Sequence, residues 1–526
     1  MTTPDGALLR GSALARLTRQ ERGRKRRDSL SWFVGTLVVC GAVALATTSA
    51  PALAIPALLG IGALYVSFRW PFAIAFTTLV VLAMTSMLDI ALGQFGSMLD
   101  DVLVLLCAFS FTVRRIWLER AVVIPPALLW FGGFLLVGVM SSLAQDVPTS
   151  IWVQQAFLSL KGFVLAVGFA QLPWNRRRLK GLIVAGAIAT VIFLICGTLN
   201  LLITEEWVRF TKIRTPITVF GIPALNGPYA QPAAFGRITA IIGVAAFCYI
   251  LTTRRVFAPL LAFITTTTLA VLTVTVKTLT SMTVVYGLLL LRVRAATPYL
   301  VLIGAVPIFA IIALPVLVDL FQTDLTAYFF NDEVESARSL LTGGAFEIAA
   351  QNFPLGAGFG RYGTYLAASE YSPEYIARDW TWRYGLGEAP EWGRYLTDTQ
   401  WPAFLGETGW LGTFFFAAGL IAMLLSMTKP IGPIEPPLYT WIRWSGIGWL
   451  ILITVESIAA PVYTSPPAFA FAFIGSAIVA ALRHDYRTHG ETFALQEYHE
   501  APDDIRREAL RRANRSASRG RRHAAS

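Results

Sequence analysis

Charge is scarce in this sequence of 526 residues, of which only 14% are charged while 55% are hydrophobic. Soluble domains carry about 25% charged residues, so the composition excludes an ordinary soluble protein. Apolar runs of about 20 residues, the length that crosses a bilayer as a helix, recur between residues 30 and 482. Because these runs do not alternate apolar and polar residues, they predict an all-α polytopic membrane protein rather than a membrane barrel.

Cysteine and histidine are equally scarce. The cysteines all lie inside apolar runs, at Cys40, Cys107, Cys196 and Cys248. The histidines all follow the last apolar run, at His484, His489, His499 and His523. The segments that we assign below to the outer side of the membrane therefore contain neither residue type, which excludes zinc ligation and Cys/His catalysis there. A nucleotide P-loop is also missing, and we expect no cofactor and no metal.

The formal net charge of +11 does not point to nucleic acid, because the basic residues gather in the two tails and in alternate connections between apolar runs. These connections carry Arg69, Arg114 with Arg115, Arg176 to Arg178, Arg254 with Arg255, Arg292 with Arg294, Lys429 and Arg483. Positive charge marks the cytoplasmic side. The alternation predicts about 14 transmembrane helices in a bacterial-type inner membrane, with both termini cytoplasmic. The basic tails also suit contact with anionic membrane lipid.

This topology divides the chain into five parts. We expect a basic cytoplasmic tail over 1–29, transmembrane helices over 30–320 with an outer loop at 204–232, a large extracytoplasmic helical loop over 321–408, further transmembrane helices over 409–482, and a basic, partly disordered cytoplasmic tail over 483–526. The individual helices predicted from the apolar runs include 71–92, 122–143, 151–172, 409–427 and 467–482. Such boundaries are precise to a few residues.

The segment 321–408 is far longer than the usual connection of about 4–6 residues. A helix is predicted from Ser336 to Asn352, and a second one begins at Ser372, which has the N-cap residue type and is followed by a proline. The glycine-rich run 354–360 between them is predicted to form a turn. Because long loops held by a rigid scaffold usually carry function, we look for the site here and in 204–232.

Cations gather in these outer segments, although positive charge is normally kept off this side of the membrane. A diphosphate ligand would explain them, because arginine binds phosphate oxygens as a bidentate fork. The candidates are Arg338, Lys277, Arg214, Arg237 and Arg361. The alternative for any single loop arginine is a solvated salt bridge with a neighbouring carboxylate such as Glu374. Lys277 stands apart, because a charge at the edge of an apolar helix is costly and usually functional.

Aromatic residues crowd the long loop. Flat apolar faces with a polar handle suit sugar rings, and the candidates for sugar binding are Trp380, Trp382, Tyr365 and Trp401. The headgroup region of a membrane collects tryptophan and tyrosine equally well. Both interpretations therefore stay open.

Two more ionisable residues have alternative interpretations. Asp398 lies just before the helix predicted over 409–427, so it is either a helix cap or a general base. Lys161 lies midway along the apolar run 151–172, where it snorkels, pairs with Asp101 or serves a function.

The order of these features resembles the O-antigen ligase and polymerase family. The motifs that carry the resemblance are Arg338-Ser, Phe346-Glu-Ile, Pro354-Leu-Gly-Ala-Gly-Phe-Gly360, Asp398-Thr399 and Glu407-Thr-Gly-Trp-Leu-Gly412, with Leu225 to Gly236 and Asp101-Val-Leu-Val-Leu-Leu upstream. Ligases place histidine where Asp398 stands, whereas polymerases often have aspartate, so this departure favours a polymerase. The family's Thr-x-Ser-Arg helix start appears here as Thr275-Val-Lys277.

The resemblance implies a C-type glycosyltransferase-like fold and a metal-independent, inverting transfer at the outer face of the membrane. The donor would be a polyprenyl-diphosphate oligosaccharide, the acceptor a glycan or glycolipid, and the product a surface polysaccharide such as O-antigen or exopolysaccharide. Asp398 and Arg338 are the expected catalytic residues, and Glu407 is expected to be structural. A chain-length regulator and a flippase are the protein partners that the resemblance suggests.

Two other classes of protein stay open. A multi-helix transporter or lipid-linked sugar flippase would place ionisable groups at mid-membrane, whereas here they gather outside. A non-catalytic membrane scaffold would not bring Arg338, Lys277 and Asp398 together, so the arrangement of these three residues distinguishes the alternatives.

Overall fold

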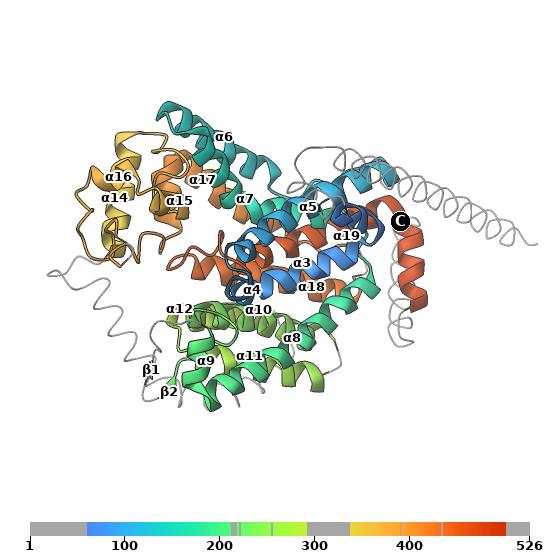
Figure 1. The fold of residues 1–526 in the computed structure, drawn as a ribbon. Coiled ribbons are helices and arrows are strands. Elements are labelled where there is room, and N and C mark those ends of the chain that lie inside the picture. Colours follow the sequence, from blue (N-terminus) through green and yellow to red (C-terminus); the bar gives the residue numbers. More distant parts are fainter. Residues whose placement is uncertain are drawn as a thin grey trace, which may run out of the picture.

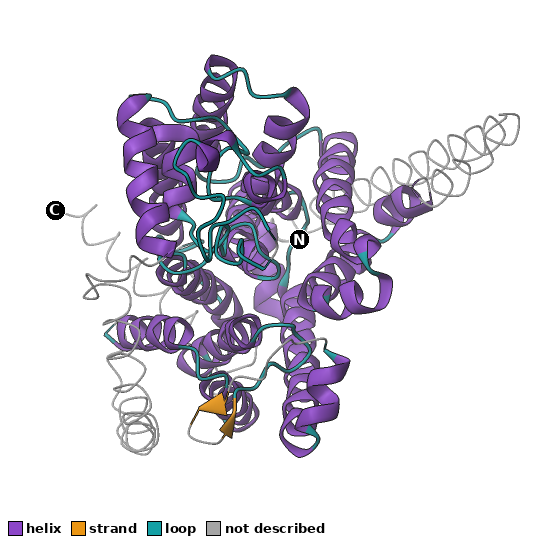
Figure 2. Cartoon of the chain, turned by 60° about the vertical axis from the view of Figure 1, so that its left-hand side comes forward, coloured by secondary structure: helices purple, strands orange, loops and turns teal. Residues whose placement is uncertain are grey.

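The computed structural model describes residues 60, 62–211, 218–219, 222–253, 256–291, 337–389, 391–432 and 435–500. Helices dominate the described chain (Figures 1 and 2), and its strands are limited to a short hairpin of Thr218–Val219 (β1) and Ile222–Pro223 (β2). The predicted helical class is therefore confirmed for these residues. The predictions that concern 1–59, 292–336 and 501–526 lie outside the described residues.

The helices follow one another along the whole described chain. Their bounds are Gly62–Arg69, α3 Pro71–Ala83, α4 Thr85–Leu92, α5 Gln94–Glu119, α6 Leu128–Ala144, α7 Thr149–Ala170, α8 Arg176–Leu202, α9 Thr204–Phe210, α10 Pro232–Thr252, α11 Phe257–Leu272, α12 Val276–Leu290, α14 Ala337–Gln351, α15 Tyr365–Ser369, α16 Pro373–Ile376, α17 Trp401–Thr428, α18 Pro437–Glu456 and α19 Ala468–Glu500.

Six helices of the described chain are long and apolar enough to cross a membrane: α7, α8, α10, α17, α18 and the Ala468–Thr488 part of α19. A seventh is reached if Gly62–Arg69 and α3, which are bent by 115° relative to each other, form one broken span. Three shorter apolar helices, α6, α11 and α12, accompany them. The chain is thus a helical membrane-embedded protein, while the number of its crossings and their orientation stay predictions.

Proline and backbone geometry explain the boundaries that the apolar pattern misplaced. The prediction of a helix over 122–143 is wrong at its start, because Pro125 and Pro126 cannot donate to a helical ladder and α6 begins only at Leu128. The run 71–92 is divided at Met84, whose φ of −113° and ψ of 12° separate α3 from α4. An unbroken apolar run therefore concealed an interruption of the helix.

Two of the last three helices, α17 and α19, are longer than predicted. α17 begins at Trp401 and bends at Gly409, where a φ of 67° is unlike helical backbone. The predicted start of this helix at Gly409 is therefore a bend inside it. α19 continues past Leu482 to Glu500, because the polar residues after 482 include good helix formers and no proline before Pro502.

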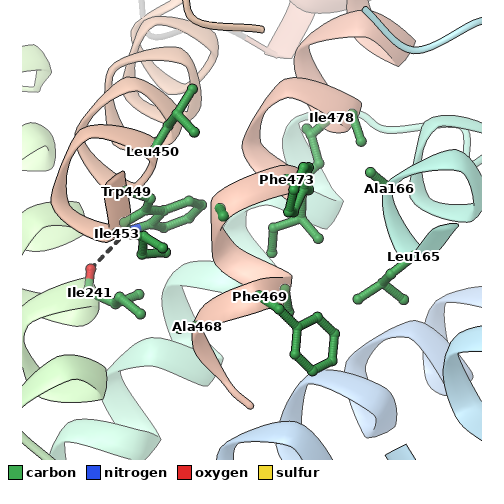
Figure 3. Close-up of a cluster of buried hydrophobic side chains, with 14 of the residues drawn as sticks. Leu165, Ala166, Ile241, Trp449, Leu450, Ile453, Ala468, Phe469, Phe473 and Ile478 are labelled. Carbon is green, nitrogen blue, oxygen red and sulfur yellow. Dashed lines mark hydrogen bonds between the residues drawn. The ribbon is translucent and has the colours of Figure 1, made fainter. Parts of the chain in front are cut away.

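The main core joins helices that are distant in the sequence. Phe469 and Phe473 of α19 lie between Leu165 of α7 and Trp449 of α18 (Figure 3). The indole of Trp449 donates a hydrogen bond of 2.8 Å to the carbonyl oxygen of Ile241 in α10. This bond satisfies the polar edge of a ring whose faces pack in apolar surroundings.

Glycine allows the central pair of helices, α18 and α19, to approach closely. A Cβ atom built on Gly475 would lie 2.5 Å from the Cα atom of Gly446, a distance that no side chain tolerates. The two backbones are therefore in direct contact at this crossing, in the manner of small-residue packing in membranes.

Residues 337–400, which we call the loop domain, have a core of their own. Leu341, Ala345 and Ile348 of α14 pack with Tyr362 and Tyr375, away from the main core. The loop domain lies at one end of the molecule, at the left of Figure 1, and Figure 2 turns that end toward the viewer. The long connection is thus a folded unit that packs on the membrane helices through α14 and α17.

Candidate functional site

The first feature of the site is an ion pair that joins the two ends of the loop domain. Arg338 is the second residue of α14, and its Nε donates to Oδ2 of Asp398 at 2.8 Å, while its Nη2 donates to the same oxygen. Both side chains keep about a quarter of their surface exposed (27% and 26%). Asp398 does not cap α17, because the N-cap residue is Gln400 and no side chain accepts a capping hydrogen bond there. The capping interpretation of Asp398 is therefore wrong.

The second feature is a buried ion pair in the membrane helices. Nη2 of Arg237 in α10 lies 2.9 Å from Oε1 of Glu456, the last residue of α18. Thr278 of α12 donates a long hydrogen bond of 3.5 Å to the same oxygen. Nε of Arg237 and Oε2 of Glu456 are buried without a hydrogen-bond partner. Since buried polar atoms are nearly always paired, such exceptions call for an explanation.

Lys277 lies within electrostatic range of both ion pairs. It is the second residue of α12, directly before Thr278, and its side chain is half-buried. The charges of Glu456, Arg237, Asp398 and Arg338 all act on its ammonium group. We call these five residues the charge cluster. Its three cations exceed its two carboxylates, so an anionic ligand would find a net positive charge there.

One helix end adds to this positive potential. Lys277 is the second residue of α12, whose N-cap is Thr275. The N-terminus of a helix carries a partial positive charge, so a cation in this position opposes the helix dipole and weakens the helix. The position of Lys277 is therefore unfavourable for the stability of α12.

The remaining predicted cations lie elsewhere. Arg361 is half-buried in the turn between α14 and α15 and makes no ion pair with a described carboxylate. Arg214 lies outside the described residues. Arg378 illustrates the alternative interpretation of a loop arginine, a salt bridge with a neighbouring carboxylate. Its Nη1 lies 2.8 Å from Oε2 of Glu374.

The four aromatic candidates separate into exposed and packed residues. Trp382 and Tyr365 are exposed (81% and 68%), so their rings are available to a ligand or to lipid. Trp380 is buried and stacks on Tyr375, with 5.8 Å between ring centroids. Trp401 packs against two phenylalanines and donates from Nε1 to Ser457 at 2.9 Å. Trp380 and Trp401 thus have packing roles in the structure, while sugar contacts of the four residues stay predictions.

The glycine-rich run forms a turn, as predicted, and its amides are already occupied. Gly360 donates to Oε1 of Glu407 at 2.7 Å, and Phe359 donates to Oγ of Ser142 at 2.9 Å. Gly358 and Gly360 have φ values of 93° and 78°, which only glycine adopts without strain. Because side chains of the protein accept these amide hydrogens, the turn is not available as a phosphate cradle.

Glu407 holds this turn from inside the protein. Its side chain is fully buried, and Oε1 also accepts a hydrogen bond of 2.6 Å from Thr364. It therefore acts on the backbone of the turn rather than on a ligand. Tyr375 is a further buried polar group, since its hydroxyl accepts from the Gly363 amide at 2.8 Å. Burial raises the pKa of Tyr375, which keeps the phenol neutral and unsuited to base catalysis.

Lys161 belongs to a separate buried group. Its Nζ lies 3.0 Å from Oδ2 of Asp100 and 3.2 Å from Oδ1 of Asp101, and 4.7 Å from the ring centroid of Phe469. Pairing with Asp101 is one of the alternatives that the sequence left open, and Asp100 adds a second carboxylate. These contacts join α5, α7 and α19 inside the membrane helices. No group of three or more potential metal ligands occurs within the described ranges.

Glu456 is a residue of the charge cluster that was not among the candidates from the sequence. The residue ends a helix whose other residues are mostly apolar, and a lone carboxylate in such a run is costly and usually functional. That signal was present in the sequence, but the run 439–459 was treated as an ordinary membrane span. Its partner Arg237 could not be inferred, because more than two hundred residues separate them and only the packing of α10 on α18 brings them together.

Comparisons with known proteins add no assignment, since neither a protein-family model nor a curated protein matches this sequence.

Proposed function

We propose that this chain is a membrane glycosyltransferase that moves an oligosaccharide from a polyprenyl-diphosphate donor to a glycan or glycolipid acceptor at the outer face of the cytoplasmic membrane. The proposal places it with the O-antigen ligases and polymerases, nearer to the polymerases. The observation that carries it is the charge cluster, in which Lys277, at the start of α12, lies within electrostatic range of the Arg338–Asp398 and Arg237–Glu456 ion pairs.

The leaving group of such a transfer is a lipid diphosphate. When the bond from the anomeric carbon to the diphosphate breaks, negative charge grows on the diphosphate oxygens. Preorganised cations in partly dehydrated surroundings stabilise that charge more than water does. Arg338 supplies a guanidinium fork and Lys277 a compact point charge. Both side chains are half-buried.

Asp398 acts on the acceptor. In the free protein its carboxylate is held by Arg338. A diphosphate is the stronger competitor for that guanidinium, because it offers several charged oxygens. Once displaced, Asp398 orients the acceptor hydroxyl and takes its proton as the hydroxyl attacks. The proton thus passes from the acceptor to Asp398, and the diphosphate leaves with the bonding electrons.

A second candidate function is transport. It is supported by the buried Lys161 and Asp100 with the half-buried Asp101 beside them, because ionisable residues inside membrane helices often mark a pathway. The two candidates differ in their product: a transporter returns the lipid-linked oligosaccharide chemically unchanged.

The test uses the purified full-length protein, a polyprenyl-diphosphate oligosaccharide and EDTA. We expect longer glycans, or glycan joined to the acceptor, without added metal or nucleotide-sugar. Transfer that depends on a divalent ion or a nucleotide-sugar would contradict the proposal. Movement of an unaltered donor across a vesicle membrane would favour the transporter.

A further inference from the structure

Glu456 is the carboxylate of the charge cluster that the proposed reaction does not use. Its side chain is fully buried at the end of α18, so it cannot touch a substrate in this conformation. Only Oε1 has partners, namely Nη2 of Arg237 at 2.9 Å and the hydroxyl of Thr278 at 3.5 Å. Oε2 has none.

The pairing with Arg237 is incomplete in a specific way. An arginine and a carboxylate usually form a fork of two parallel hydrogen bonds. Here Nε of Arg237 and Oε2 of Glu456 are both buried and both unpaired, so half of that fork is missing. A pair optimised for stability would use these atoms, because each unpaired buried group costs free energy. The pair therefore holds Arg237 with only part of its hydrogen-bonding capacity used.

We infer that Glu456 is a built-in counterion that limits the affinity of the charge cluster for diphosphate. This inference rests on the proposed function, in which the lipid diphosphate must leave after each transfer. Once Asp398 is displaced from Arg338, the three cations of the charge cluster would hold an anionic product tightly. Because Glu456 stays buried beside Arg237 and acts on Lys277, its negative charge offsets part of this attraction and speeds release. Glu456 thus acts on the bound diphosphate through its charge, without touching it.

The substitution Glu456→Gln tests this inference, because it removes the charge and keeps an acceptor for Arg237. The probe is inorganic pyrophosphate, added to the full-length protein in detergent. We expect the dissociation constant for pyrophosphate to fall on the order of tenfold, because the substitution removes one negative charge that repels the ligand at a partly buried site. The variant should have a lower Tm than wild type, because Arg237 is left without a counter-charge. Saturating pyrophosphate should raise that Tm more than it raises the wild-type Tm.

The matched control is Glu435→Gln. Glu435 lies just before the start of α18, whereas Glu456 is the last residue of that helix. Glu435 pairs with Arg443 through Nη2 at 2.7 Å and Nε at 2.9 Å. It lies about 30 Å along α18 from Glu456, at a rise of 1.5 Å per residue. This variant should also lose stability, but its affinity for pyrophosphate should equal that of wild type.

A second comparison avoids the uncompensated arginine altogether. Arg237→Gln and the double variant Arg237→Gln/Glu456→Gln differ only in the carboxylate, so their ratio of dissociation constants isolates its effect. We expect the double variant to bind pyrophosphate about tenfold more tightly. This comparison remains decisive even if Glu456→Gln alone does not fold.

The outcomes separate this inference from the proposed function. If both comparisons show equal or weaker binding without the carboxylate, Glu456 only holds Arg237 in place and the inference is wrong, while the transferase proposal stands. If wild type binds no pyrophosphate and transfers no sugar, the proposed function falls and the inference falls with it.

Discussion

At the scale of single residues, the account depends on Arg338. Its guanidinium is bound to Asp398 in the structure, and in the proposed reaction it becomes the fork for the diphosphate. Arg338→Ala should lower transfer by about 100-fold or more, because an unpaired diphosphate oxygen loses several kcal/mol of stabilisation. Arg338→Lys should also be poor, because lysine cannot form the fork. The measurement is the rate of transfer at equal amounts of folded protein. A wild-type rate in either variant would show that Arg338 forms only a surface salt bridge and has no role in transfer.

Asp398 holds Arg338 in the structure and is the proposed proton acceptor, and the substitution Asp398→Asn separates these two roles. Asparagine keeps an acceptor for Arg338, and the partly exposed ion pair contributes only about 1 kcal/mol or less, so the Tm should change little. Loss of the proton acceptor should lower kcat by about 10²–10⁴-fold. Thermal unfolding and initial rates measure the two effects. An active Asp398→Asn protein would show that the residue only holds Arg338.

At the scale of elements, Glu407 connects α17 to the glycine-rich turn. It is the acceptor for the Gly360 amide and the Thr364 hydroxyl, at 2.7 and 2.6 Å. Glu407→Ala should leave both donors buried and unpaired, at a cost of about 1–3 kcal/mol each. Glu407→Gln should destabilise less, because its amide oxygen still accepts. Limited proteolysis of the loop domain measures the stability of the wild-type protein and of the two variants. Equal resistance of the Ala and Gln variants would show that Glu407 does not hold the turn through these hydrogen bonds.

How much the sequence revealed differs from element to element. The helix 336–352 and the start at Ser372 were predicted correctly as α14 and α16, because capping and proline chemistry is local: Ser372 accepts from the Glu374 amide. The break at Met84 could not be predicted, because nothing local in the apolar run marks it. The bend at Gly409 has a tertiary cause, since a Cβ atom there would lie 2.1 Å from the Leu355 carbonyl oxygen.

The same contrast applies to the site. Arg338, Lys277, Arg237 and Asp398 could be selected from the sequence, because charge is conspicuous in a chain with so little of it. Their pairing could not, since 60 residues separate Arg338 from Asp398. The role of Trp380 was also hidden, because an aromatic residue in a loop is as readily the core of a small domain as a sugar platform.

At the scale of the whole molecule, the account requires the loop domain to lie outside the cytoplasm. Ser369 at the end of α15 is exposed, so Ser369→Cys provides a reporter on its surface. Cys107 and Cys248 are buried and give little background. An impermeant maleimide should label Ser369→Cys in intact cells or spheroplasts. Labelling that requires permeabilisation would overturn the predicted topology.

The central claim is that the charge cluster releases a lipid diphosphate as sugar is transferred. The most direct measurement counts both products in one reaction, with purified protein, a polyprenyl-diphosphate oligosaccharide and EDTA. The account predicts one polyprenyl diphosphate released for each glycosidic bond formed, and neither product with Arg338→Ala. Glycan growth without release of lipid diphosphate, or release without glycan growth beyond slow hydrolysis, would contradict it.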